Sequence, residues 1–228
     1  MPQTERMPRP ASDLEITIAL RRVAVGVVLL LVGVLLGVAI SLNVDPLDVD
    51  NWWNGAVATL PPALQPLALL LDRLGGGVIA TYAVPLGAAA LLLLARRPWG
   101  ALTFLVASAV SVGVVQLLKG AFGRVRPEDM LVISDHGSFP SGHTANAATI
   151  AVVVTVLFPR VWVALIGAAW TAAMAFSRTY VHAHWFSDTL GGALIGAGAA
   201  LLVAAAFTVP LWREQERRRL SWAGPPAH

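Results

Sequence analysis

The sequence predicts an all-α polytopic membrane protein: six transmembrane helices in a bundle, with a short amphipathic helix in the first outer loop. Of its 228 residues, 57% are hydrophobic and only 13% are charged, whereas soluble domains average roughly 45–50% apolar and about 25% charged residues. Apolar runs of about the length that crosses a bilayer recur along the chain, separated by short polar turns. With no internal repeat and no second domain, residues 1–228 are expected to form a single domain.

The first predicted span is the aliphatic run at residues 23–42. A cleaved signal peptide is the alternative, because arginines precede the run. Its apolar stretch is longer than the roughly 7–15 residues of a signal-peptide core, which favours a retained helix. Residues 1–22 are polar and are expected to be partly disordered or to lie at the interface.

Residues 45–66 interrupt the apolar pattern with acids, the pair Trp52-Trp53 and the pair Pro61-Pro62. We expect an extramembrane loop whose amphipathic helix rests its tryptophans at the level of the lipid headgroups. The alternative is that these tryptophans grip a substrate tail. The apolar stretch 67–71 is too short to span.

Five further spans follow, with a polar loop at 119–143 between the third and the fourth span of the chain. They are expected at residues 76–95, 99–118, 141–158, 161–177 and 185–211. Pro85 predicts a kink in the first of these, because proline removes a helical hydrogen bond. In the last, the Gly192-x-x-x-Gly196 spacing would let a neighbouring helix approach closely.

Charge asymmetry predicts the orientation. With six spans, both termini and the turns at residues 96–97 and 160 lie on one side, which carries 11 of the 16 Lys and Arg residues. The positive-inside rule makes this side cytoplasmic, with residues 1–22 and 213–228 as cytoplasmic tails. The bias towards arginine over lysine and the high alanine content suggest a GC-rich bacterial genome. The membrane is then expected to be a bacterial plasma membrane, with the polar blocks around residues 119–127, 140–143 and 177–188 on its extracytoplasmic face.

Three polar blocks stand out at residues 119–127, 140–143 and 177–188. The first contains Lys119 and Arg126, seven residues apart, which would share a face if the third helix continued that far. With Arg178 of the third block they gather three cations on a side otherwise nearly free of them. Snorkelling at the membrane edge explains one such residue but not three. Ionisable residues near membrane depth are costly and indicate a functional site.

The second block opens a helix. Ser141 is a suitable N-cap, and free N–H groups at a helix N-terminus bind phosphate. Gly142 permits close approach of a ligand to the backbone. A plain cap at Ser141 and a hydrogen-bonded interfacial role for His143 are the alternatives when each residue is taken alone.

In the third block, His184 and Asp188 are spaced i, i+4 and would face the same way. A carboxylate on one ring nitrogen fixes the tautomer and leaves the other nitrogen a lone pair, as in an oriented base or nucleophile. A zinc site is the alternative, but it needs about three protein ligands, and the other histidines lack a tight ligand spacing. His182 would lie on another face and is interpreted as non-catalytic. The three cations favour an anionic ligand, so no metal and no cofactor are expected.

Together the blocks Lys119-x6-Arg126-Pro127, Pro140-Ser141-Gly142-His143 and Ser177-Arg178-x5-His184-x3-Asp188 resemble the three-part signature of the type 2 phosphatidic acid phosphatase family. That superfamily also contains vanadium haloperoxidases and bacterial acid phosphatases, and six spans fit its membrane branch. No motif position departs from the pattern.

The resemblance implies a role for each motif residue. His184 would attack phosphorus to form a phosphohistidine, Asp188 would orient it, and His143 would protonate the leaving oxygen. The phosphoryl oxygens would be held by Lys119, Arg126, Ser141, the backbone N–H of Gly142, and Arg178.

The expected function is that of a metal-independent membrane lipid phosphatase. A polyprenyl diphosphate such as undecaprenyl pyrophosphate is the first choice of substrate, with phosphatidylglycerol phosphate and phosphatidic acid open. The alternatives are a haloperoxidase, a lipid phosphotransferase that uses the same phosphohistidine, and a non-catalytic binder or transporter of phosphorylated lipids. A net charge of +3 is too small and too scattered for nucleic-acid binding. The expected partners are therefore the lipid substrate and the bilayer, and the sequence gives no indication of oligomeric state.

Overall fold

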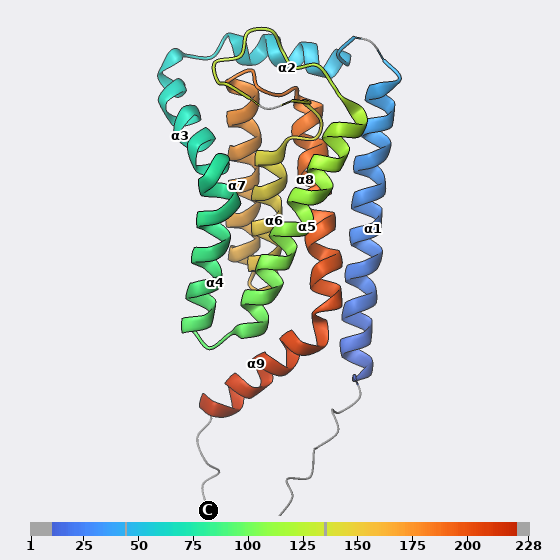
Figure 1. The fold of residues 1–228 in the computed structure, drawn as a ribbon, viewed down its shortest axis with the longest axis vertical. Coiled ribbons are helices and arrows are strands. Elements are labelled where there is room, and N and C mark those ends of the chain that lie inside the picture. The colour runs from blue at the N-terminus through green and yellow to red at the C-terminus, as the bar shows by residue number, and fades with distance from the viewer. Residues whose placement is uncertain (1–10, 44, 135, 223–228) are drawn as a thin grey trace, which may run out of the picture.

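The computed structural model describes residues 11–43, 45–134 and 136–222, and every regular element within these ranges is helical (Figure 1), which confirms the predicted all-α class. Nine α-helices are described in this part of the chain, joined in two places by short 3₁₀ or π turns. They are α1 (Asp13–Ser41), α2 (Asp48–Ala58), α3 (Gln65–Gly75), α4 (Val84–Leu94), α5 (Pro98–Phe122), α6 (Gly142–Leu157), α7 (Val161–Tyr180), α8 (Phe186–Ala206) and α9 (Thr208–Trp222). The turns are the 3₁₀ turn Pro62–Leu64 and the π turn Ile79–Ala83.

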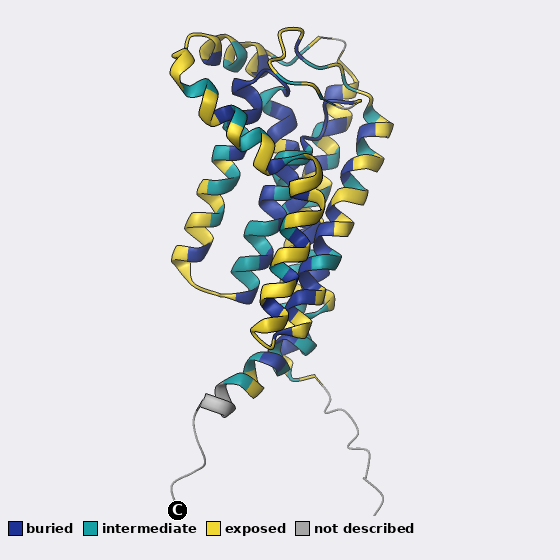
Figure 2. Ribbon diagram, turned by 60° about the vertical axis from the view of Figure 1, so that its left-hand side comes forward, coloured by how far each residue is buried: buried dark blue, intermediate teal, exposed yellow. Residues whose placement is uncertain are grey.

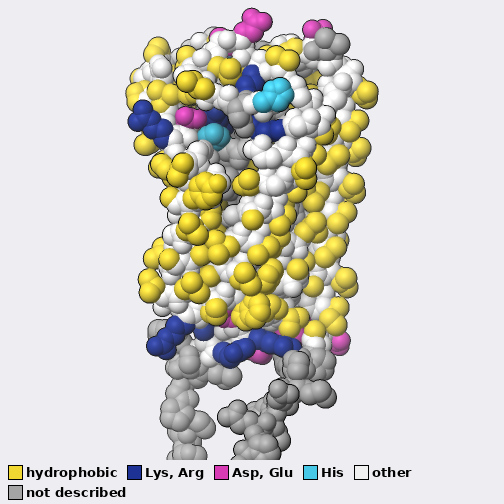
Figure 3. Space-filling view, viewed as in Figure 1, with side chains coloured by type: hydrophobic (Ala, Val, Ile, Leu, Met, Phe, Trp, Pro, Cys, Tyr) yellow, Lys and Arg dark blue, Asp and Glu magenta, His cyan; other side chains and the backbone are white. Residues whose placement is uncertain are grey.

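The surface of the bundle is that of a membrane protein. Hydrophobic side chains cover its middle, and charged side chains gather towards its two ends (Figure 3). The outward faces of the peripheral helices are exposed, whereas the central helices are buried (Figure 2). Four helices, α1, α5, α7 and α8, are long and apolar enough to cross a bilayer, and a bent pair that includes α3 and α4 is a fifth candidate. Helix α6 is apolar but shorter, with 16 residues.

Helix α1 begins ten residues before the predicted first span. Ser12 caps it: the Glu15 backbone N–H donates to the Ser12 hydroxyl at 3.4 Å, and the Ser12 N–H donates to the Glu15 carboxylate at 2.6 Å. This capping box satisfies donors that a helix N-terminus otherwise leaves unpaired. Residues 13–22, expected to be partly disordered or to lie at the interface, are therefore part of this ordered helix, and residues 1–10 lie outside the described part of the chain.

The predicted second span, 76–95, covers only half of a longer broken helix. Residues Pro62–Gly75 and Ile79–Leu94 meet at 49° across the break at Gly76–Gly77, so the stretch 67–71 is part of a candidate span and not of a loop. Gly77 has φ +57°, a conformation that residues with a Cβ rarely adopt. The main bend therefore lies at these glycines. At Pro85, where a kink was predicted, the helix widens instead into the preceding π turn.

Helix α8 occupies the centre of the bundle and packs closely on α6. A Cβ atom at Gly192 would lie 2.4 Å from the Ser141 carbonyl oxygen, and one at Gly196 would lie 2.1 Å from that of Ala145. The close approach predicted from the Gly-x-x-x-Gly spacing is therefore confirmed. Because Ser141 precedes α6 directly, this packing fixes the start of α6 against the first turns of α8.

The two ends of the bundle are closed by shorter helices. The predicted span 185–211 ends at Ala206, and α9 then leaves at an angle (Figure 1), tied back by a 3.4 Å ion pair between Glu214 and Arg97. At the opposite end α2 lies across the bundle, and it is the amphipathic helix predicted in 45–66. Trp52 is exposed there, whereas Trp53 stacks on Phe186 at 5.1 Å between ring centroids.

We predict that Gly196→Ala destabilises the protein by about 1–3 kcal/mol, because its Cβ would collide with the backbone of α6. The matched control is Gly113→Ala on α5, where a Cβ would meet no atom within 4 Å. Thermal unfolding in detergent should show a lower midpoint for Gly196→Ala and an unchanged or higher midpoint for Gly113→Ala. Equal midpoints for the two variants would contradict the role given to Gly196.

Candidate active site

The three polar blocks converge on a cavity of about 350 Å³ near the α2 end of the bundle. This end carries a hollow around which histidine, acidic and basic side chains gather (Figure 3). Five residues of the blocks line the cavity: Lys119, Gly142, His143, Arg178 and His184. The opposite wall is formed by the glycine break after α3, by the following π turn and by one face of α5.

His184 lies in the turn between α7 and α8 and is 3% exposed. Its Nε2 lies 3.2 Å from the Nη1 of Arg126. A guanidinium group only donates hydrogen bonds, so Nε2 must hold the lone pair and the proton must be on Nδ1. Nδ1 lies 3.6 Å from the Asp188 carboxylate, which suits this tautomer. His184 therefore presents an unprotonated nitrogen on the side of the cations.

Burial lowers the pKa of His184 to about 3, and the positive charges of Arg126 and Arg178 act in the same direction against the opposing effect of Asp188. The imidazole is therefore neutral at neutral pH. A neutral imidazole with a defined tautomer is the form that a nucleophile requires.

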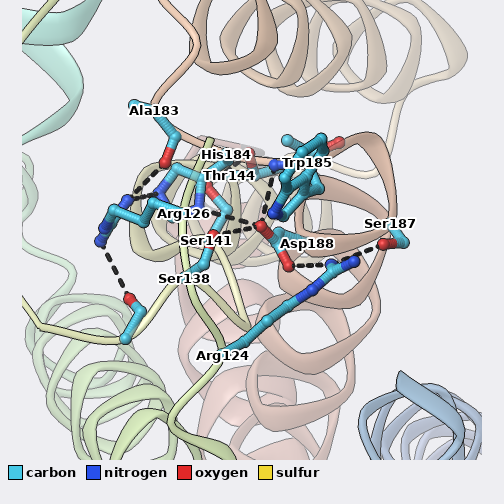
Figure 4. A network of polar contacts seen from close by, with 12 residues as sticks. Arg124, Arg126, Ser138, Ser141, Thr144, Ala183, His184, Trp185, Ser187 and Asp188 are labelled. Atoms are coloured by element: carbon cyan, nitrogen blue, oxygen red, sulfur yellow. Dashed lines mark hydrogen bonds and ion pairs between the residues drawn. The ribbon is translucent and has the colours of Figure 1, made fainter. Parts of the chain in front are cut away.

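Asp188, in the first turn of α8, is completely buried and held from several directions (Figure 4). Its Oδ2 accepts hydrogen bonds from the Trp185 backbone N–H at 2.9 Å and from the Ser138 hydroxyl. Its Oδ1 accepts from Arg124 at 2.5 Å. The structure places the predicted partners His184 and Asp188 next to each other, with 3.6 Å between Nδ1 and the carboxylate, which is just beyond hydrogen-bond distance. His184 precedes α8, so a helix-capping turn brings the two together and not a shared helical face.

Sequence reasoning did not find Arg124 and Asp50, which extend this network. Arg124 donates to the Asp50 carboxylate on α2 at 2.7 Å as well as to Asp188. Asp50 is completely buried and also accepts from the Ser187 backbone N–H at 2.8 Å. The arginine thus lies between two buried carboxylates. Arg124 lies within the first block and could have been noted there, whereas nothing in residues 45–66 distinguishes Asp50 from the exposed acids beside it.

Lys119 and Arg126 come together, but not on one helix. Helix α5 ends at Phe122, because Gly123 adopts a left-handed conformation with φ +54°. The helix therefore does not continue to Arg126, and the condition for a common helical face is not met. Both side chains instead donate to the Gly137 carbonyl oxygen, Lys119 at 3.1 Å and Arg126 at 2.9 Å, so the loop between α5 and α6 gathers them.

Ser141 is the N-cap residue of α6, as predicted, but its side chain makes no capping hydrogen bond. Its hydroxyl accepts from that of Thr144 at 3.2 Å, and its N–H donates to the Asp188 carbonyl oxygen at 2.9 Å. A Cβ at Gly142 would meet a single neighbouring atom within 4 Å, on Val115 at 3.7 Å. Protein packing therefore does not require glycine at this position, which faces the cavity.

Arg178 and His143 both contact Asp72, a residue of α3 that sequence reasoning also missed. Arg178 is 1% exposed and donates to the Asp72 carboxylate. The Nε2 of His143 lies 3.1 Å from the Asp72 carbonyl oxygen and 3.4 Å from its carboxylate. An acid within the apolar stretch after Pro66 was the available signal, because ionisable residues near membrane depth indicate function.

His182, interpreted from the sequence as non-catalytic, is directed to α2: its Nδ1 lies 2.7 Å from the Asn54 side-chain oxygen. Across the described ranges, no three His, Cys, Asp or Glu side chains are grouped as a metal site would require.

The family model of the PAP2 superfamily matches residues 100–211, a range that contains all three blocks. The chain contains a PAP2 superfamily domain. This confirms the resemblance inferred from the blocks, since the superfamily is the one to which type 2 phosphatidic acid phosphatases give their name.

Relatives of this PAP2 domain are phosphatases by name. The chain is 36% identical to a lipid A 1-phosphatase of Rhizobium johnstonii over 106 residues, which are 41% of this chain and 42% of that protein. It is 25% identical to an undecaprenyl-diphosphatase of Sulfolobus acidocaldarius over 171 residues, 72% of this chain and 77% of that protein. The match thus spans less than half of the Rhizobium protein.

A solved structure has a similar fold. It is the crystal structure of a transmembrane PAP2-type phosphatidylglycerolphosphate phosphatase from Bacillus subtilis, with a TM-score of 0.67 and 26% sequence identity. The similarity covers 78% of this chain and 93% of the Bacillus chain.

We predict that Arg124→Ala lowers the free energy of unfolding by about 3 kcal/mol or more, because it leaves two buried carboxylates without their shared counter-ion. Arg160→Ala, at an exposed position between α6 and α7, is the matched control. Thermal unfolding in detergent checks the difference. A loss no larger than that of the control would show that the network around Asp188 does not depend on Arg124.

Proposed function

We propose that this protein is an integral membrane phosphatase that hydrolyses a phosphorylated lipid through a phosphohistidine intermediate. The observation that carries the proposal is the environment of His184. Its unprotonated Nε2 lies beside Arg126, while its Nδ1 side faces the buried carboxylate of Asp188. Arg178 and Lys119 line the same cavity. A neutral nucleophile beside three cations suits attack on the phosphorus of an anionic substrate.

In the first step, the Nε2 of His184 attacks phosphorus, the bond from phosphorus to the ester or anhydride oxygen breaks, and its electron pair goes to that oxygen. Asp188 stabilises the positive charge that develops on the imidazole. His143 is the proton donor to the departing oxygen. Lys119, Arg126, Arg178, Ser141 and the N–H of Gly142 hold the phosphoryl oxygens.

In the second step, water attacks the phosphohistidine, the phosphorus–nitrogen bond breaks, and inorganic phosphate leaves. His143, now neutral, accepts a proton from the water. Phosphoryl transfer depends mainly on positioning and on stabilisation of charge, which the cations provide. The scheme requires neither a metal ion nor a cofactor.

The names of the relatives support a lipid as the substrate. They include phosphatases of lipid A, of undecaprenyl diphosphate and of phosphatidylglycerol phosphate. The substrates to compare are therefore a polyprenyl diphosphate, phosphatidylglycerol phosphate and phosphatidic acid. In this scheme the motif residues would hold only the phosphate end of such molecules, so the lipid part must be identified by experiment.

The arrangement in the membrane is part of the proposal. Six crossings result if the bent pair α3–α4 counts as one and α6 as another. Helix α6 is about 24 Å long at 1.5 Å per residue. Extended residues lead into it, and Ser138, Phe139 and Ser141 among them are completely buried. Non-helical backbone at membrane depth is tolerated where protein covers it.

We further propose that residues 1–228 act as one domain in a bacterial plasma membrane. The positive-inside rule places the α9 end, the termini and the tails 1–22 and 213–228 in the cytoplasm, and the cavity on the extracytoplasmic side. This orientation would let the site meet lipids in the outer leaflet.

His184→Ala should abolish phosphate release, because no other group replaces the nucleophile. The purified protein would be assayed with EDTA on a polyprenyl diphosphate, its monophosphate, phosphatidylglycerol phosphate, phosphatidic acid and a soluble sugar phosphate. His182→Ala, which alters a histidine outside the cavity, is the control and should retain activity. Release by His184→Ala at the wild-type rate would exclude the phosphohistidine. Transfer of phosphate to an added alcohol in place of water would indicate a phosphotransferase.

Gly142→Ala should fold normally but raise the KM for the lipid phosphate about tenfold or more, because its methyl group would project into the cavity beside the phosphate-binding N–H. Thermal unfolding and initial rates measured on the same sample separate the two effects. Gly113→Ala again provides the control. An unchanged KM would show that phosphate does not approach the start of α6.

A further inference from the structure

Asp72 on α3 brings one carboxylate to two residues with different proposed roles. It accepts from Arg178, which would hold the phosphoryl group, and it lies 3.4 Å from the Nε2 of His143, which would protonate the departing oxygen. No sequence block includes it, and it belongs to the half of the broken helix that precedes the family match at residues 100–211.

The contact with His143 defines the state of that ring. The Asp72 carbonyl oxygen, 3.1 Å from Nε2, can only accept, so Nε2 carries a proton. Proton donation requires the imidazolium form, in which Nδ1 also carries a proton. Burial and the charge of Arg178 disfavour this form, and the carboxylate of Asp72 opposes their effect. With Nε2–H directed to Asp72, Nδ1–H is the donor that remains for the departing oxygen.

The two glycines at the end of α3, after Asp72, pack directly against the imidazole ring of His143. A Cβ at Gly76 would lie 2.3 Å from Nε2 of His143, and a Cβ at Gly75 would lie 3.1 Å from its Cδ2. Glycine at these two positions therefore lets the end of α3 approach His143 as closely as Asp72 requires. The contact with the Asp72 carbonyl oxygen therefore follows from the backbone, and the Asp72 carboxylate adds its charge beside the same ring nitrogen.

The same carboxylate affects which group can depart. The departing group must lie next to His143, and therefore near the negative charge of Asp72. An alcohol leaves as a neutral molecule once it is protonated, and it needs the proton because an alkoxide is strongly basic. A diphosphate instead releases a phosphate monoester, whose pKa of about 6 lets it leave as an anion without a proton. Asp72 would repel that anion, while it helps to supply the proton that an alcohol needs.

We propose that Asp72 is a positioning residue for His143 and makes the site selective for lipid phosphate monoesters over lipid diphosphates. The proposal rests on the proposed phosphatase function and narrows its substrate class. In the preferred reaction, His184 takes the phosphoryl group, the phosphorus–oxygen ester bond breaks, and the Nδ1 proton of His143 goes to the departing oxygen to give the free alcohol. Asp72 keeps its charge throughout.

The test compares a polyprenyl monophosphate with the polyprenyl diphosphate of the same tail, in the same detergent, by initial rates of phosphate release. Wild-type protein should show the higher kcat/KM on the monophosphate. Asp72→Asn should lose about 10- to 100-fold of kcat on the monophosphate and little or none on the diphosphate, because only the first needs proton donation. The ratio of the two kcat/KM values should therefore fall at least about tenfold.

Two further variants complete the design. Asp48→Asn removes an exposed carboxylate of α2, outside the cavity, and should keep the wild-type ratio. Asp72→Glu keeps the charge and should restore part of the monophosphate activity. Retained diphosphate turnover by Asp72→Asn shows that this variant is folded. If Asp72→Asn does not fold, the proposal is tested by the wild-type ratio of the two kcat/KM values and by the activity of Asp72→Glu on the monophosphate.

Two results would overturn the selectivity: a wild-type preference for the diphosphate, or equal losses on both substrates in Asp72→Asn. Either would leave the phosphatase function intact. If the wild-type protein releases phosphate from neither of these two lipids and from none of the other lipids in the wider panel, the proposed function itself is refuted.

Discussion

The site depends on one buried carboxylate, that of Asp188. A charge without solvent needs partners, and Asp188 receives them from the loop after α5, from the residues before α6 and from the turn before its own helix. Arg124 links it to Asp50 of α2, so the interfacial helix also takes part. Because one carboxylate gathers these segments, the end of α5 that carries Lys119 and the following loop that carries Arg126 and Ser141 are fixed relative to His184. The contacts that stabilise the charge of Asp188 are therefore the same contacts that assemble the site.

Close contacts at glycines of α8 also fix the positions of the helices that carry the site. Close packing of α8 on α6 sets the distance between the two ends that carry Asp188 and His143. A bulkier residue at Gly192 or Gly196 would separate these helices and with them the proposed nucleophile and proton donor. At Gly75 and Gly76 the absence of side chains serves the ring of His143 in the same way. These glycines matter because they let neighbouring segments approach closely enough to position Asp188 and His143. A displacement of about 1 Å in an active site can cost much of the reaction rate.

The sequence predicted the apolar helices and the motif residues around the cavity, because hydropathy and fixed spacing are local properties. It placed the start of α1 too late, since the capping box at Ser12 and Glu15 extends a helix into polar residues. It predicted a kink at Pro85 but not the bend at the glycines, because three consecutive glycines did not reveal how far α3 runs before them. Asp50 and Asp72 were missed for a different reason: their partners, Arg124 and His143, are more than 70 residues away in the chain, and no local pattern encodes such a pairing.

The position of Asp72 outside the motif blocks has a physical consequence. In the proposed mechanism, every substrate offers the same phosphoryl group to His184 and to the cations, so those residues would not distinguish one substrate from another. Substrates differ in what leaves, and the departing group lies on the other side of phosphorus, against His143 and α3. Selection must therefore come from residues on that side, where Asp72 contributes a negative charge and the glycine break shapes the wall of the cavity. In the proposed mechanism, change at the end of α3 would alter which lipid is hydrolysed while the chemistry at His184 is preserved.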